Sequence, residues 1–226
     1  MNFMQWLNSL DDLLYEVMSW LIFFPVTLWR VVTRPLGMMD YANLEVHEKA
    51  EEQFTDTISP PLFLVIALLL SHGIELVLGG GTNPIVARND GLASLVNDNT
   101  TLLMLRLVVF SVFPLMLAVR LLRAKSVVLT RSRLRAPFYA QCYAAAPFAL
   151  LVGMGTSIAH THHVWSLPAG SMIAIMSVTG YAGVQAAWFA RHLDISVANA
   201  LLHTVRGLVT GAVLAFIIAL LFTGGV

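Results

Sequence analysis

Apolar residues are grouped in five long runs with short polar segments between them. The runs cover residues 61–78, 101–122, 136–155, 168–189 and 205–222. A helix of roughly 20 apolar residues, rising about 1.5 Å per residue, crosses a hydrocarbon core of about 30 Å. Helices also close all their backbone hydrogen bonds internally, which a lipid solvent requires. The pattern therefore predicts an all-α, polytopic membrane protein with five transmembrane helices.

A different pattern precedes the first run. Over residues 3–33 apolar side chains recur at helical spacing, and polar side chains occupy the opposite face. The apolar side chains are Trp6, Leu7, Leu10, Leu13, Leu14, Val17, Met18 and Leu21. The polar ones are Asn8, Asp11, Asp12 and Glu16. We therefore expect residues 1–35 to form an amphipathic helix that lies in the membrane interface.

A sixth span is the alternative for this N-terminal segment. Only 13 residues separate the charges of Glu16 and Arg30, and Pro25 falls among them. A run of that length is nearer to an interfacial or re-entrant segment than to a span. A spanning helix here would place the N-terminus outside, which the acidic start of the chain would tolerate.

Residues 36–59 join the N-terminal helix to the first run and contain the most polar segment of the chain. Four glutamates lie in it, namely Glu45, Glu48, Glu51 and Glu52. The simplest interpretation is a solvated, acidic cytoplasmic connector helix that ends at Ser59, where a serine caps and prolines begin the next helix. The alternative is a docking surface for a basic partner or for the protein's own Arg-rich second loop. Residues 60–226 then form the five-helix transmembrane domain.

Composition and charge agree with a single membrane domain. Hydrophobic residues make up 58% of the chain and charged residues 12%, whereas a soluble domain carries about 25% charged residues. Six of the 13 lysines and arginines border the second loop, namely Arg120, Arg123, Lys125, Arg131, Arg133 and Arg135, while the third loop has none. By the positive-inside rule the second and fourth loops are cytoplasmic. The N-terminus is then cytoplasmic and the C-terminus lies outside.

Small residues recur at every fourth position in the last three runs. The sets are Ala145, Ala149 and Gly153; Gly183 and Ala187; and Gly207, Gly211, Ala215 and Ala219. Small residues at this spacing let helix backbones approach closely, and packing then replaces the absent hydrophobic drive between helices in lipid. We expect these faces to be internal seams, with dimerisation as the alternative.

Ionisable residues inside the apolar runs are the best functional candidates, since each costs at least about 2.5 kcal/mol at mid-membrane. The first run carries His72 and Glu75, and the second carries Arg106 at a matching depth near the outer face. An ion pair between Glu75 and Arg106 would satisfy both charges. The alternative is a proton- or substrate-coupled binding site built from all three residues. His72 and Glu75 alone provide too few ligands for a metal.

The third loop carries three histidines, His160, His162 and His163. They are weak candidates for zinc or copper ligands, because four ligands are usual and the loop offers no Cys, Asp or Glu. We expect an exposed, pH-responsive loop. Cys142 lies inside a predicted span and is expected to be a small buried hydrophobe. Without a phosphate-binding glycine loop or a spaced nucleophile and base, we expect no enzyme activity, no cofactor and no bound metal.

Three short motifs resemble those of the Yip1-domain family of membrane proteins. They are YAAAP at residues 143–147, VWSL at 164–167 and ISVANALL at 195–202. The five-span layout with the N-terminus inside is similar as well. The resemblance implies a five-helix domain over residues 60–222 without a known catalytic centre. Eukaryotic members act in vesicle trafficking with small GTPases, and bacterial members are often labelled permeases.

These observations lead to two expected functions. The first is a non-enzymatic integral inner-membrane protein of a bacterium, with a membrane-organising, assembly or partner-binding role. The second is a permease for a small solute or lipid, which with five spans would need to form an oligomer. Expected partners are membrane lipids and a membrane protein or second copy of the chain, and no nucleic acid.

Overall fold

The computed structural model describes residues 3–49, 52–78, 99–161 and 163–223, which form seven helices and no strand. The helices are α1 Phe3–Thr33, α2 Pro35–Glu45, α3 Pro60–Val77, α4 Asn99–Ala124, α5 Arg131–Ala159, α6 Ser166–Leu193 and α7 Val197–Thr223. The predicted all-α class is confirmed. Residues 79–98, which follow the first predicted span, lie outside the described residues.

Six helices in the described part of the chain are long and apolar enough to cross a membrane. Five of them are α3 to α7, and each contains one of the predicted spans within its bounds or within one residue of them. The sixth is the segment Leu10–Thr33 of α1, which the sequence analysis places in the interface with a span as the alternative. The count rises to six because α1 runs without a break through Glu16, Pro25 and Arg30.

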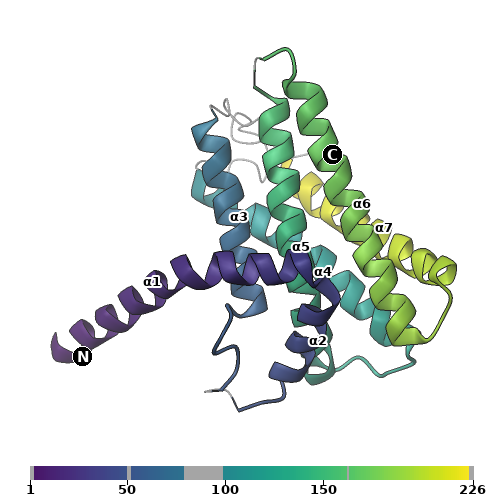
Figure 1. Cartoon of the computed structure of the whole chain (residues 1–226), viewed down its shortest axis with the longest axis horizontal. Helices are drawn as coiled ribbons and strands as arrows, with labels where there is room; N and C mark the ends of the chain where they lie inside the picture. Colours follow the sequence, from purple (N-terminus) through teal and green to yellow (C-terminus); the bar gives the residue numbers. More distant parts are fainter. Residues whose placement is uncertain (1–2, 50–51, 79–98, 162, 224–226) are drawn as a thin grey trace.

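The helix α5 lies at the centre of the fold. It packs against α2, α3, α4 and α6, and α7 packs against α4 and α6. Figure 1 shows α3, α5 and α6 running side by side, with α1 lying across α3 and α5 rather than along them. The central position of α5 follows from its small side chains. Its buried residues include Ala140, Cys142, Tyr143, Ala144, Ala145, Ala146 and Ala149, which allow neighbouring backbones to come close.

Two of the three predicted seams of small residues are confirmed. A Cβ atom added at Gly153 of α5 would collide with the Ser71 side chain of α3. A Cβ atom at Gly207 of α7 would lie 2.7 Å from Leu117 Cδ2 of α4. The prediction for Gly183 of α6 is wrong, because this residue is exposed and nothing lies within 4 Å of the position of an added Cβ. Spacing identifies a face of small residues but not the neighbour that fills it.

The predicted solvated connector helix is also wrong in form. Among the described residues of this segment, only those of Pro35–Glu45 are helical, and Met38 and Met39 on that helix are buried against the core. The chain then turns back, and Phe54 is buried with a φ of 55° while its amide donates to Glu45 Oε2 at 2.8 Å. The few apolar residues of this segment pack it against α5. Its many charged residues made this packing difficult to predict from the sequence.

Candidate functional site

The predicted intramembrane residues lie together where α3 ends and α4 begins. Arg106 Nη1 on α4 lies 2.5 Å from Glu75 Oε2 on α3. His72 stands one turn before Glu75, and its Nδ1 is 3.5 Å from both Glu75 Oε2 and Arg106 Nη1. The predicted ion pair between Glu75 and Arg106 is therefore confirmed, and His72 completes a three-membered polar cluster.

This polar cluster is only partly buried. His72 is buried, whereas the side chains of Glu75 and Arg106 keep 23% and 26% of their surface exposed. The carboxylate and guanidinium neutralise each other, and the imidazole lies beside the pair. No group of three or more His, Cys, Asp or Glu that could hold a metal ion occurs among the described residues.

A second polar group, which we call the junction, consists of Arg30, Tyr41, Asp56, Thr57 and Tyr143. Arg30 Nη1 donates to Asp56 Oδ2 at 2.7 Å, and the Tyr41 hydroxyl donates to Asp56 Oδ1 at 2.6 Å. Thr57 Oγ1 lies 3.3 Å from the Tyr41 hydroxyl and 3.1 Å from the Tyr143 hydroxyl. The junction thus links α1, α2 and the segment between α2 and α3 to α5.

The junction is held together over a wide pH range. The hydrogen bond from Tyr41 and the nearby Arg30 lower the pKa of Asp56, although partial burial opposes them. Burial and the Asp56 carboxylate raise the pKa of Tyr41 above its ordinary value. The stabilisation from Asp56 is present above the ordinary carboxyl pKa and is lost as pH falls through the lowered one. The stabilisation from Tyr41 is present below the ordinary tyrosine pKa and is lost as pH rises through the raised one.

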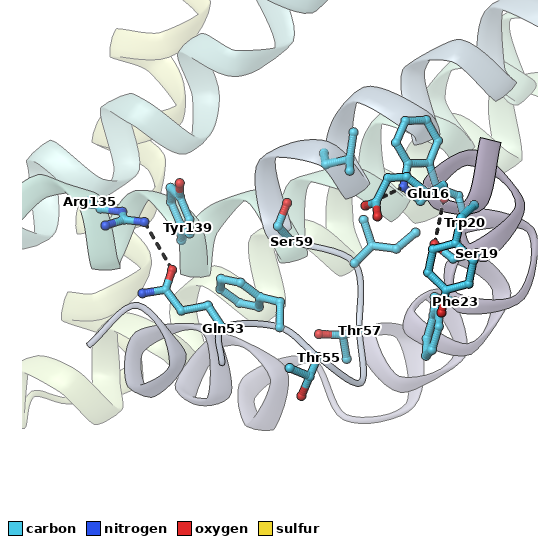
Figure 2. A pocket seen from close by; sticks show the side chains of 14 residues that line it. Glu16, Ser19, Trp20, Phe23, Gln53, Thr55, Thr57, Ser59, Arg135 and Tyr139 are labelled. Atoms are coloured by element: carbon cyan, nitrogen blue, oxygen red, sulfur yellow. Dashed lines mark hydrogen bonds between the residues drawn. The ribbon is translucent and has the colours of Figure 1, made fainter. Parts of the chain in front are cut away.

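A polar cavity of about 440 Å³ lies beside the junction, between α1, the connector and α5. In Figure 2, Glu16 and Trp20 of α1 stand at one end of this cavity and Arg135 and Tyr139 of α5 at the other. Arg135 Nη2 donates to Gln53 Oε1 at 3.3 Å. Four hydroxyl side chains also line this cavity, namely Ser19, Thr55, Thr57 and Ser59.

A larger cavity of about 630 Å³, the apolar groove, lies between the middle of α4 and the first turns of α5. Its apolar lining consists of Leu107, Val108, Val112, Leu115, Leu134 and Phe138. Arg131 and Arg135 line it as well, together with Tyr139. Arg135 and Tyr139 are shared with the polar cavity, and the Arg135 guanidinium carbon lies 5.3 Å from the centroid of the Tyr139 ring.

The weak metal candidates of the third loop are not gathered into a site by the described residues. His160 Nδ1 lies 2.7 Å from the Thr156 carbonyl oxygen at the end of its own helix. His163 is exposed, and His162 lies outside the described residues. The loop has instead a structural interaction, because the Ser166 hydroxyl donates to the Thr161 and His163 carbonyl oxygens.

Two polar features of the structure were missed by reasoning from sequence. The junction joins residues as far as 86 positions apart, Thr57 and Tyr143, and no periodic pattern marks them. Gln185 Nε2 of α6 donates to Gln141 Oε1 of α5 at 2.6 Å, with both side chains buried. Polar residues inside apolar runs were the available signal for this pair, as they were for Glu75 and Arg106.

The fold and its apolar helices define the chain as a helical integral membrane protein. Comparisons with family models, with curated proteins and with solved structures find no match. The resemblance to the Yip1-domain family therefore stays a prediction from short motifs.

Proposed function

We propose that this protein is a non-enzymatic integral membrane protein with a membrane-organising role, and that α1 is the element that performs it. In this proposal α1 lies in the cytoplasmic leaflet of a bacterial inner membrane, as a member of the Yip1-domain family would have its N-terminus inside. The observation that carries the proposal is the course of α1, which lies across α3 and α5 instead of alongside them (Figure 1).

The two parts of α1 have different surroundings. Its second half packs on the core through Phe24, Thr27 and Val31, which are buried. Every side chain from Leu10 to Met18 is exposed. The exposed apolar side chains at helical spacing are Leu10, Leu13, Leu14, Val17, Met18 and Leu21. Lipid is the surrounding that would cover such a face, with Asp11 and Asp12 directed to water.

A helix held in one leaflet adds area to that leaflet alone. Amphipathic helices that bury their apolar face at the headgroup boundary respond to membrane curvature and lipid packing. Most such helices are free to leave the membrane, but the junction holds α1 to the spans through Arg30 and Asp56. We therefore expect the whole protein to prefer strongly curved membranes.

The test is the distribution of the protein between small and large vesicles of the same lipid composition. Fluorescently labelled full-length protein should be several-fold enriched, per unit membrane area, in the small vesicles. The variant with Leu13→Asp and Leu21→Asp should lose this enrichment while its spans still insert, because both side chains are exposed. A matched variant with Leu13→Met and Leu21→Met should behave as the native protein. An even distribution of the native protein would rule out the proposed role.

The second candidate is a permease for a small solute or lipid, acting as an oligomer. The cluster of His72, Glu75 and Arg106 favours it, since transporters use ionisable residues within their spans. In proteoliposomes with a pH-sensitive dye inside, this candidate requires proton movement that His72→Gln abolishes.

A further inference from the structure

The apolar groove lies on the outer surface of the bundle. Val108, on its α4 side, exposes 49% of its surface, and Leu134 and Phe138, on its α5 side, are half-buried. In an integral membrane protein such a surface is in contact with lipid chains. A volume of about 630 Å³ is within the range of small-molecule sites and has room for a large part of an acyl chain.

Two cations stand at the end of this groove where α5 begins. Arg131, Arg135 and Tyr139 recur at every fourth position and therefore share one face of α5. Within the described part of the chain, neither arginine has a carboxylate within 4.0 Å; Arg135 contacts the neutral Gln53 amide and the Tyr139 ring. Guanidinium groups bind phosphate oxygens in pairs of parallel hydrogen bonds. This end of the groove is thus suited to a phosphate.

The polar cavity continues the site on the other side of Arg135. Arg135 and Tyr139 line both spaces, so a phosphate at Arg135 would lie at the boundary between apolar and hydroxyl-bearing surroundings. Ser19 and Thr55 are among the hydroxyl side chains on the polar side (Figure 2). A ligand that fits the apolar groove, Arg135 and the polar cavity in this order has an apolar chain, an anionic phosphate and a polar headgroup.

We propose that the apolar groove binds one anionic glycerophospholipid, with an acyl chain between α4 and α5 and the phosphate on Arg131 and Arg135. Basic pockets between spans recognise anionic headgroups in this way. A zwitterionic lipid fits less well, because its own cation would be placed near two arginines. The site goes beyond the proposed role of α1 and does not depend on it, since the residues that hold the acyl chain and the phosphate belong to α4 and α5, and α1 contributes only to the headgroup end.

The test measures lipid binding by the full chain in mild detergent. Native mass spectrometry counts bound dioleoyl phosphatidylglycerol, and dioleoyl phosphatidylcholine serves as the neutral comparison. The native protein should prefer phosphatidylglycerol, and Arg131→Gln with Arg135→Gln should weaken its binding by roughly 30-fold. Arg133→Gln is the matched control, because Arg133 stands in the same turn but lines neither cavity. Equal binding of both lipids, or an equal loss in the control, would overturn the site.

Two further variants keep the test decisive if the double arginine variant folds poorly. Ser111→Trp leaves both arginines in place and fills the groove that Ser111 lines, so it should weaken phosphatidylglycerol binding about tenfold. Val178→Trp introduces the same side chain at an exposed position that lines neither cavity and should leave binding unchanged. Free glycerol 3-phosphate that binds as tightly as the lipid would show a site for soluble phosphate instead. Unaltered binding in Ser111→Trp would show that no chain enters the groove.

The outcome is separable from that of the proposed function. The Leu13→Asp, Leu21→Asp variant changes only α1 and should bind phosphatidylglycerol as the native protein does. The arginine variant should keep its preference for curved vesicles. Loss of one property without the other identifies which proposal fails.

Discussion

Two arginine–carboxylate pairs in this protein differ in what surrounds them. The Arg30–Asp56 pair is largely exposed, with 44% and 56% of its side-chain surface accessible, and pairs of this kind contribute about 0–1 kcal/mol. The Glu75–Arg106 pair has half that exposure and lies within two apolar helices. Its separate charges would be expensive there. We therefore assign the greater energetic weight to the intramembrane pair.

Removing one member of the Glu75–Arg106 pair should destabilise the protein more than removing both. Glu75→Gln or Arg106→Gln alone leaves an uncompensated charge, which costs roughly 2–3 kcal/mol for a pair that is not fully buried. The double variant leaves neither charge and should recover most of that loss. Thermal unfolding of the four proteins in one detergent measures the difference. Strictly additive losses would show that the two side chains do not interact in the membrane.

At the scale of helices, α5 and α6 approach each other backbone to backbone. A Cβ atom added at Gly155 would lie 2.7 Å from the Gly170 carbonyl oxygen, and one at Gly170 would meet the Gly155 backbone in turn. The buried hydrogen bond between Gln141 and Gln185 joins the same two helices further along. Close backbone packing and an interhelical hydrogen bond are the two interactions that associate helices in lipid.

A larger side chain at Gly170 should separate α5 from α6. Gly170→Val places its Cβ against the backbone of α5, which cannot yield as a flexible side chain does, so we expect a loss of about 2–3 kcal/mol. Gly180→Val on the same helix is the control, because nothing lies within 4 Å of its added Cβ. Thermal unfolding midpoints in detergent compare the two. Equal midpoints would contradict the close approach.

The helices themselves were predictable because apolar runs of this length have few alternatives in lipid. Their neighbours were less predictable. Gly153 and Gly207 were recognised from small-residue spacing and do form contacts. Gly155 and Gly170 were not recognised, although Ala159 and Ala174 follow them at the same four-residue spacing and lie at the same contact. The burial of Phe54 was missed because its partners Tyr139 and Tyr143 lie far along the chain.

At the scale of the whole molecule, the basic residues around Arg135 predict the orientation in the membrane. Reporter fusions after Arg135 and after Asp194 should report the cytoplasm, and fusions after Asn89 and after His162 should report the outside. The reason is the concentration of arginine and lysine at the second loop and their absence from the third. A second loop found outside would refute the five-span topology. A label at Asn2 tests whether α1 forms a sixth span, because only a spanning α1 places the N-terminus outside.

The candidate sites were predictable to different degrees. His72, Glu75 and Arg106 were found because an ionisable residue in an apolar run is conspicuous on its own. Arg131 and Arg135 were recognised for orientation and as part of a basic loop that acidic segments of the chain could contact. Their second property, a shared position beside the apolar groove and the polar cavity, depends on how α4 and α1 pack against α5, and no local pattern encodes that packing.

The junction makes α1 a lever fixed at one end. The part from Phe3 to Ser19 is 17 residues of helix, which at 1.5 Å per residue is an arm of about 25 Å. Its far end has no clamp among the described contacts from Leu10 to Met18, while Arg30, Tyr41 and Asp56 hold the near end. A change of lateral pressure in the leaflet that tilts the arm therefore acts as a torque on Thr57 and Tyr143. Through these residues, membrane tension would reach α5, the helix on which the other spans are packed.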